Sequence, residues 1–360
     1  MKEWKDKFNS FNSDKGLTYT NWYEDIKYWK DGLVKPLAPV EVSLDPILAC
    51  QLKCNHCNAH KYLEEGKEKL RLSDDLLMDT IYFLRRFGVK AICFGGGGEP
   101  TLHTKLPDAI RACNATQSSI ATNGIVLNDD LLDAMKHCRW IGVSVDAATE
   151  ETYEVGRRMN KFNQVLDNIE DMTTVNKDVC FKFLIFDYNQ HEIFEACKLA
   201  KELGVSAFHA RPADINHQGL GEFRNTAKPF NVEKVLEQFE KCHELEDEKF
   251  KVFTVVHKFD KDFKPVKNFT QCYASPCCLQ LCADGNAYLC PDQRYQEFYK
   301  LGSFNPPSNI LNFWGSKRHY DLVFKTGKEV CNTRCTFAPY NEQCERLFIN
   351  QDDPMCRYFI

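Results

Sequence analysis

Three cysteines lie close together in the stretch CQLKCNHC, where Cys50, Cys54 and Cys57 are separated by three and then two residues. A structural zinc site takes four protein ligands, and no fourth cysteine is adjacent, although His56 and His60 are near. A [4Fe–4S] cube held by three thiolates leaves one iron open to an exogenous ligand. The spacing favours an iron–sulfur site, with a zinc site and an inert cysteine-rich loop as the alternatives.

A second candidate for chemistry is the run of four glycines in CFGGGGEPTLH, residues 93–103. Glycine lets the backbone approach a ligand that a Cβ would block. The run lacks the lysine and the serine or threonine of a nucleotide P-loop, so it does not match that class of phosphate site. Turns and phosphate loops also use glycine runs, so the run by itself leaves a ligand contact and a plain turn open.

The elements that must position these residues alternate in type along the chain. The clearest helical pattern is SDDLLMDTIYFLRRFG, in which Ser73 is a good N-cap, Leu77, Ile81 and Leu84 share one face, and Gly88 supplies the stop. A similar pattern, NQHEIFEACKLAKELG, precedes the last strand. The strand-like segments occupy residues 41–50, 90–96, 118–124, 140–146, 180–186 and 207–213.

Six alternating units predict a parallel sheet with helical crossovers, either an incomplete barrel or an open doubly wound sheet. In both architectures the functional residues gather at the C-terminal ends of the strands. The cysteine loop follows the first strand and the glycine run follows the second. The two candidate loops are thus expected to lie side by side.

Together, C-x3-C-x2-C after the first strand and GGEP after the second resemble the radical S-adenosylmethionine (SAM) superfamily. The segments ATNG (121–124) and SVD (144–146) and the placement of Arg157 four residues after Tyr153 agree with it. The resemblance covers residues 41–213. It implies a partial (β/α)6 barrel and an enzyme that reductively cleaves SAM to a 5′-deoxyadenosyl radical, which abstracts hydrogen from a substrate.

The resemblance also implies roles for individual residues. Cys50, Cys54 and Cys57 would ligate the SAM-binding [4Fe–4S] cluster. One departure is His56, where many members carry an aromatic residue, and we expect it to affect packing rather than ligation. The residues implied to contact SAM are Gly97, Gly98 and Glu99 for its amino group, Ser144 and Asp146 for its ribose or carboxylate, Arg157 for its carboxylate, and Thr122 and Asn123 at the third strand end.

The C-terminal region holds nine of the 18 cysteines, and LQLCADGNAYLC within it reads as a hairpin turning at residues 284–285. It resembles the auxiliary-cluster extension called Twitch, or its longer relative SPASM. The resemblance implies that Cys272, Cys290, Cys331 and Cys335 bind an auxiliary [4Fe–4S] cluster, although three residues rather than the usual two separate the last pair. The alternatives are zinc, no metal, or a second auxiliary cluster that uses some of Cys277, Cys278, Cys282, Cys344 and Cys356.

Candidate substrate contacts are Arg211 at the end of the sixth strand and Asp292 and Arg294 just past the hairpin. We expect these three at the catalytic site, with structural salt bridges as the alternative. His103, His209 and His217 are ordinary loop histidines or acid–base groups.

The family includes dehydrogenases, epimerases and peptide modifiers. We expect a radical SAM oxidoreductase that removes two electrons from a small polar metabolite, such as a sugar or aminocyclitol, with a flavodoxin- or ferredoxin-type protein as electron donor. The roughly 40 residues before the barrel look too short for a leader-peptide-binding domain. The alternatives are a radical epimerase, a sulfatase-maturating-like enzyme that modifies peptides or proteins, and a non-catalytic iron–sulfur electron-transfer protein.

The bulk composition sets the remaining expectations. The chain has 360 residues, is 43% hydrophobic and carries a net charge of −5, so neither disorder nor a nucleic-acid partner is expected. The charged N-terminus has no signal-peptide core, and no apolar run approaches a membrane span. We expect a soluble cytoplasmic protein with an N-terminal extension (1–40), a core barrel (41–250) and an auxiliary-cluster domain (251–360).

Overall fold

The computed structural model describes residues 20–65, 69–214, 228, 231–255, 267, 269–326, 331 and 335–345. Its strands form one ten-stranded sheet in the order β10-β9-β8-β1-β2-β3-β4-β5-β6-β7. The run from β8 through β1 to β7 is parallel throughout. The strands are β1 (Glu41–Leu44), β2 (Ala91–Phe94), β3 (Gln117–Thr122), β4 (Cys138–Ser144), β5 (Val179–Ile185), β6 (Ala207–Pro212), β7 (Lys251–Thr254), β8 (Cys278–Leu281), β9 (Asn286–Tyr288) and β10 (Lys300–Ser303).

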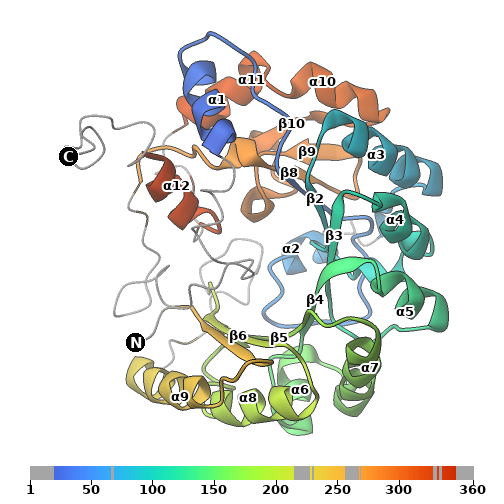
Figure 1. Ribbon diagram of the computed structural model, residues 1–360, viewed down its shortest axis with the longest axis vertical. Helices are drawn as coiled ribbons and strands as arrows, with labels where there is room; N and C mark the ends of the chain where they lie inside the picture. The colour runs from blue at the N-terminus through green and yellow to red at the C-terminus, as the bar shows by residue number, and fades with distance from the viewer. Residues whose placement is uncertain are drawn as a thin grey trace.

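The sheet curves into a barrel that does not close, with α3 to α9 along its outer side (Figure 1). The expected partial barrel is therefore confirmed, and the open doubly wound sheet is not what forms. None of the helices in the described part of the chain has the length and hydropathy to span a bilayer. The helices are α1 (Thr20–Lys30), α2 (His60–Glu64), α3 (Asp74–Phe87), α4 (Leu106–Cys113), α5 (Asp129–Met135), α6 (Glu150–Arg157), α7 (Phe162–Val175), α8 (Ile193–Glu202), α9 (Val232–Glu244), α10 (Ile310–Phe313), α11 (Lys317–Phe324) and α12 (Ala338–Cys344).

Helix α3 shows how local sequence signals set these elements. The Ser73 hydroxyl accepts a hydrogen bond from the Leu76 amide at 3.1 Å, which satisfies one of the free N–H groups of the first turn. Gly88 ends the helix with φ of 102°, a left-handed conformation that glycine adopts without a Cβ clash. Leu77, Ile81 and Leu84 are fully buried, so the predicted face is the one that packs on the sheet.

The C-terminal region extends the barrel sheet. Strand β8 pairs in parallel with β1, with Glu41 in register with Cys278, and β8 and β9 form the expected antiparallel hairpin. The turn uses Gly285 at φ of 75°. At the other edge β7 adds a parallel strand beyond β6, so the hydrogen-bonded sheet continues past residue 250.

The inside of the barrel is hollow in part because many of the inward-facing strand residues are small. Outward residues such as Val42, Leu44, Ile92, Phe94 and Ile120 are fully buried under the helices. A filled parallel barrel carries bulky branched residues on its inner face as well. Here a cavity of about 590 Å³ remains. Its small lining residues include Ser43, Ala91, Cys93, Ser119, Ala121 and Ser144.

Candidate functional site

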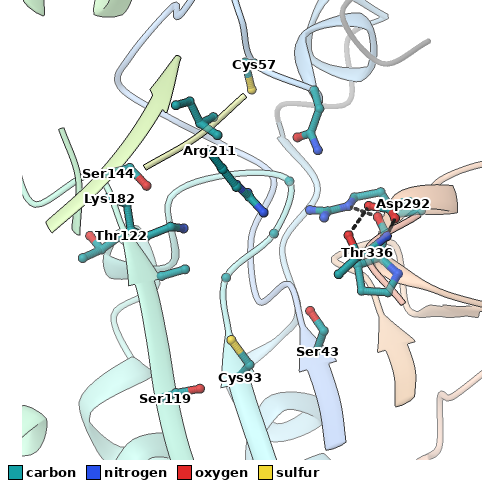
Figure 2. A pocket seen from close by; sticks show the side chains of 18 of the residues that line it. Ser43, Cys57, Cys93, Ser119, Thr122, Ser144, Lys182, Arg211, Asp292 and Thr336 are labelled. Carbon is teal, nitrogen blue, oxygen red and sulfur yellow. Dashed lines mark hydrogen bonds between the residues drawn. The ribbon is translucent and has the colours of Figure 1, made fainter. Parts of the chain in front are cut away.

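The cysteine loop leaves the C-terminal end of β1 and lines the barrel cavity with all three of its thiols. Cys54 is buried, and Cys50 and Cys57 are partly buried; none of the three is in a disulfide. A backbone hydrogen bond from Cys57 to the Cys54 carbonyl at 3.2 Å turns the loop. Figure 2 shows Cys57 at one end of the pocket.

The chemistry of this donor set fits a cluster of several irons. Burial raises the pKa of Cys50 to about 12, with Glu99 and the other two cysteines adding to the rise, and burial raises the pKa of Cys57 to about 11. Thiolates here need positive charge beside them, which iron supplies. In the described ranges no three Cys, His, Asp or Glu side chains are grouped to hold a single ion. A multi-iron cube spaces its thiolates more widely than one ion does.

Close contacts with other parts of the protein require glycine at two positions of the glycine run. Gly96 has φ of 117°, and a Cβ there would lie 1.4 Å from the Asp45 carboxylate. A Cβ on Gly98 would lie 2.4 Å from the carbonyl oxygens of Leu48 and Ala49. The run therefore packs against the segment that leads into the cysteine loop, while Gly97 and Gly98 also line the cavity. The close approach that the structure shows is to other parts of the protein, and the contact with a ligand stays a prediction.

Glu99 joins the ends of β2 and β3. Its Oε1 accepts hydrogen bonds from the Thr122 hydroxyl at 2.7 Å and from the Thr101 hydroxyl at 2.8 Å, and its Oε2 accepts from the Asn123 amide at 2.7 Å. Asn123 in turn points its side-chain amide at the Cys50 sulfur, 3.8 Å away. The structure thus brings Glu99, Thr122 and Asn123 together beside the cysteine loop, as the sequence predicted.

Asp146 and Arg157 form a buried ion pair at the end of β4, with 2.6 Å between Nη2 and Oδ2. Burial alone would raise the pKa of Asp146, but the charge of Arg157 and the hydrogen bond from His56 lower it to about 2. Arg157 also donates to the Ser144 carbonyl at 2.7 Å and to the Cys54 sulfur at 3.5 Å. All of these residues line the cavity.

His56 connects this ion pair to the segment that follows β5. Its Nε2 lies 3.2 Å from the Asp146 carboxylate, its Nδ1 lies 3.1 Å from the Tyr188 hydroxyl, and its ring centroid is 4.6 Å from that of Phe186. The ring packs among aromatic residues, as expected, and in addition takes part in the Asp146 network.

The four predicted auxiliary-cluster cysteines converge in the structure. The Asn341 amide lies 3.9 Å from the Cys272 sulfur and 3.8 Å from the Cys335 sulfur. The Gln293 amide lies 2.9 Å from the Cys331 sulfur. Burial, then Asp292 and the other three cysteines raise the pKa of Cys290. A group of four cysteines with amide donors beside their sulfurs, in which burial raises the pKa values of Cys272, Cys290 and Cys335, fits an iron–sulfur cluster. Cys356 lies outside the described residues.

The three predicted catalytic residues line the same cavity but differ in what they contact. Asp292 accepts from the Thr336 amide at 2.8 Å and hydroxyl at 2.9 Å, which ties the loop after Cys290 to the loop after Cys335 (Figure 2). Arg294 lies 3.7 Å from the buried Asp45 and donates to the Pro291 carbonyl. Arg211 extends from β6 toward the middle of the pocket (Figure 2).

The candidate histidines differ from the cavity residues. His103 bonds to the Leu72 carbonyl at 3.0 Å, and His209 is buried beside Phe253, so neither lines the cavity. His217 lies outside the described residues.

Sequence reasoning missed Lys182, which lines the cavity from β5. The signal was a single charged residue within the apolar run CFKFLIF, because a strand of a covered parallel sheet is otherwise apolar on both faces. It also missed Asp45, which is fully buried at the end of β1. Cys93, Cys277 and Cys278 line the cavity as well.

Comparison with solved structures supports this architecture. The chain superposes on Streptococcus suis SuiB bound to S-adenosylmethionine with a TM-score of 0.64 at 14% identity, over 86% of this chain and 72% of that one. It superposes on native anSMEcpe with bound AdoMet and Kp18Cys peptide with a TM-score of 0.60 at 16% identity, over 84% of this chain and 88% of that one. At such identities the likeness establishes the fold.

Sequence comparisons find relatives that match part of the chain. An AdoMet-dependent heme synthase of Methanosarcina barkeri is 25% identical over 210 residues, 56% of this chain and 58% of that protein. A probable GTP 3′,8-cyclase of Metallosphaera sedula is 25% identical over 213 residues, 58% of this chain and 63% of that protein. The chain thus matches less than two thirds of either relative. Residues 45–200, which carry the cysteine loop, the glycine run and Arg157, match the model of the Radical SAM superfamily.

Proposed function

We propose that this radical SAM enzyme oxidises a small polar substrate held in the barrel cavity. The observation that carries the proposal is the extent of that cavity. It is lined by Cys50, Cys54 and Cys57 and also by Asp292 and Thr336, which adjoin the second group of cysteines. A substrate in this space has one predicted cluster site on each side.

The residues present fit both clusters and SAM. Cys50, Cys54 and Cys57 would hold the first cluster, and Cys272, Cys290, Cys331 and Cys335 the second. When bound, these groups supply one-electron chemistry: cleavage of SAM to methionine and a 5′-deoxyadenosyl radical at the first, and an acceptor for an electron of the substrate at the second.

The chain's own contribution is to orient the reactants. Glu99, fixed by four donors, and the Asp146–Arg157 pair present preset charges to SAM, so little reorganisation accompanies binding. Gly97 and Gly98 keep that wall of the cavity free of side chains. The surrounding strands hold the substrate away from bulk water, which suppresses side reactions of a radical.

Anaerobic reconstitution followed by measurement of 5′-deoxyadenosine tests the core of the proposal. Wild-type protein given SAM and a reductant should form 5′-deoxyadenosine, and Cys54→Ala should abolish its formation. Cys113→Ala is the matched control, because Cys113 is equally buried but lies in α4 away from the cavity. Continued formation in Cys54→Ala would show that the loop is not the SAM-cleaving site.

The mass of the product tests oxidation. After reaction in deuterium oxide, an oxidised product is two mass units lighter than its substrate and carries no solvent deuterium at the attacked carbon. A product one mass unit heavier than its substrate, with one solvent deuterium at the attacked carbon, would instead identify an epimerase, with Cys93, Cys277 and Cys278 as the thiols that line the cavity. Modification of a peptide is a second candidate, because one fold neighbour, native anSMEcpe, has a bound Kp18Cys peptide.

A further inference from the structure

Lys182 places a cation inside the barrel without an acidic partner. It lies on β5, in register with Ser144 on β4 and His209 on β6, and lines the cavity. Within the described ranges, no carboxylate lies within salt-bridge distance of its ammonium, and the ammonium donates no hydrogen bond. Its Nζ lies 6.0 Å from the centroid of the Trp140 ring.

The other acidic and basic groups nearby are already engaged. Arg157 pairs with Asp146, and Arg294 lies 3.7 Å from Asp45. Asp146 is held by other donors, because its Oδ2 accepts from Arg157 and His56 while its Oδ1 accepts from the Leu184 amide at 2.7 Å. The charge on Lys182 therefore faces the cavity.

Arg211 adds a second positive charge to the same wall. Arg211 lies on β6, in register with Leu184 of β5, which is two residues after Lys182. The side chains of Lys182 and Arg211 project into the same space (Figure 2). Burial and then the charge of Arg211 lower the pKa of Lys182 to about 8. A bound anion beside these two cations would reduce the repulsion between them.

We propose that Lys182, together with Arg211, binds an anionic group of the substrate, a carboxylate or a phosphate. This inference rests on the proposed function, since it assumes that the substrate occupies the barrel cavity. The hydroxyl of Ser144 and the small residues around it leave room for such a group beside the ammonium. The substrate class is therefore a small anionic metabolite rather than a neutral sugar.

The first test divides a metabolite extract on an anion exchanger and measures 5′-deoxyadenosine formed with each fraction. Wild type should be stimulated by the anionic fraction, and Lys182→Met should need about tenfold more of it or lose the stimulation. Lys182→Arg should retain the response, as should Lys198→Met, a control at an exposed lysine paired with Glu195 on α8. Loss of the stimulating activity after phosphatase treatment identifies a phosphate, and its survival identifies a carboxylate.

Three results would overturn the inference. One is stimulation by the neutral or cationic fraction alone, and another is an unchanged response of Lys182→Met. The third is a matching rise in the KM for SAM in Lys182→Met, which would mean that the anion is the carboxylate of SAM itself. If wild type forms no 5′-deoxyadenosine under any condition, the proposed function fails instead.

A direct binding measurement covers the case in which no fraction stimulates. Reconstituted protein saturated with SAM is titrated with inorganic pyrophosphate and with citrate as probes. Wild type should bind at least one of them about tenfold more tightly than Lys182→Met does. Equal binding by the two proteins, or no binding by either, would overturn the anion site.

Discussion

The Lys182 ammonium gives a pH dependence whose sign follows from its lowered pKa. Below pH 8 the side chain is charged, so kcat/KM for an anionic substrate is full there and falls as pH rises through about 8. A bound anion stabilises the charged form, so kcat should fall only at higher pH. Several facing groups titrate far from pH 8: the pKa of Asp146 is about 2, that of Cys93 about 11 and that of Cys180 about 12, and Arg211 stays charged. His209, in register with Lys182 on β6, is a further titratable neighbour, and the Lys182→Arg variant separates its titration from that of Lys182.

Rate measurements from pH 6 to 10 check this profile. Lys182→Arg should remove the fall near pH 8, because a guanidinium keeps its proton throughout this range. A fall of the same size and midpoint in Lys182→Arg would assign the titration to another group.

A second prediction for a single residue concerns the side-chain amide of Asn341. It is fully buried and lies between the sulfurs of Cys272 and Cys335, while its oxygen accepts from the Ala274 amide at 2.7 Å. Asn341→Asp keeps the acceptor and replaces the donor with negative charge. The reduction potential of the auxiliary cluster should fall, because hydrogen bonds to sulfur stabilise the reduced state.

Potentiometric titration followed by electron paramagnetic resonance would measure that shift. Asn163→Asp is the control, since Asn163 is exposed on α7. An unchanged potential together with an unchanged iron content in Asn341→Asp would remove Asn341 from the cluster's surroundings.

At the scale of elements, Asp45 at the end of β1 links two parts of the fold. Its carboxylate accepts from the Gly97 amide at 3.0 Å and from the Gln280 side chain on β8 at 3.0 Å. It thus joins the glycine run to the C-terminal hairpin. Asp45→Ala should lower the free energy of unfolding by about 3 kcal/mol, because it leaves the Arg294 charge buried without its partner.

Denaturant titration of wild type and variant provides the check. Asp79→Ala, at an exposed position on α3, should stay within about 0.5 kcal/mol of wild type. The KM for SAM should also rise in Asp45→Ala, since Gly97 loses its anchor. Equal unfolding free energies for the two variants would refute this role of Asp45.

The elements themselves were predictable because their signals are local. The cap at Ser73, the stop at Gly88 and the turn at Gly285 each act within a few residues. The parallel pairing of β8 with β1 was not predictable, since nothing in either segment specifies a partner so far along the chain.

At the candidate site, the short sequence motifs were predictable, whereas the network of contacts between strands was not. The spacing of Cys50, Cys54 and Cys57 and the type of Glu99 led to the prediction of a SAM-binding edge of the barrel, and these four residues line one cavity. The side chains that complete it depend on strand register, which composition does not reveal. Lys182 faces the cavity because of its position in β5, and Asp45 contacts Gly97 because two loops cross.

For the whole molecule, iron content distinguishes one auxiliary cluster from two. Reconstituted wild type should carry about eight irons, and the variant with Cys50, Cys54 and Cys57 all changed to alanine should carry about four. Colorimetric iron determination per protein chain gives the number. No iron in the triple variant would show that the second group of cysteines does not hold a cluster by itself, and about eight would show two auxiliary clusters.

The pairing of β1 with β8 also orders events during synthesis. Strand β1 leaves the ribosome first, but its partner at Cys278 follows only after the intervening chain is translated, on the order of tens of seconds later. Until then one edge of β1 has no strand beside it, and an unpaired edge invites association with other chains. The strand that leads into the cysteine loop therefore has a neighbour on both sides only after the ribosome has made Cys272 and Cys278. We expect the clusters to be inserted only at this late stage of synthesis.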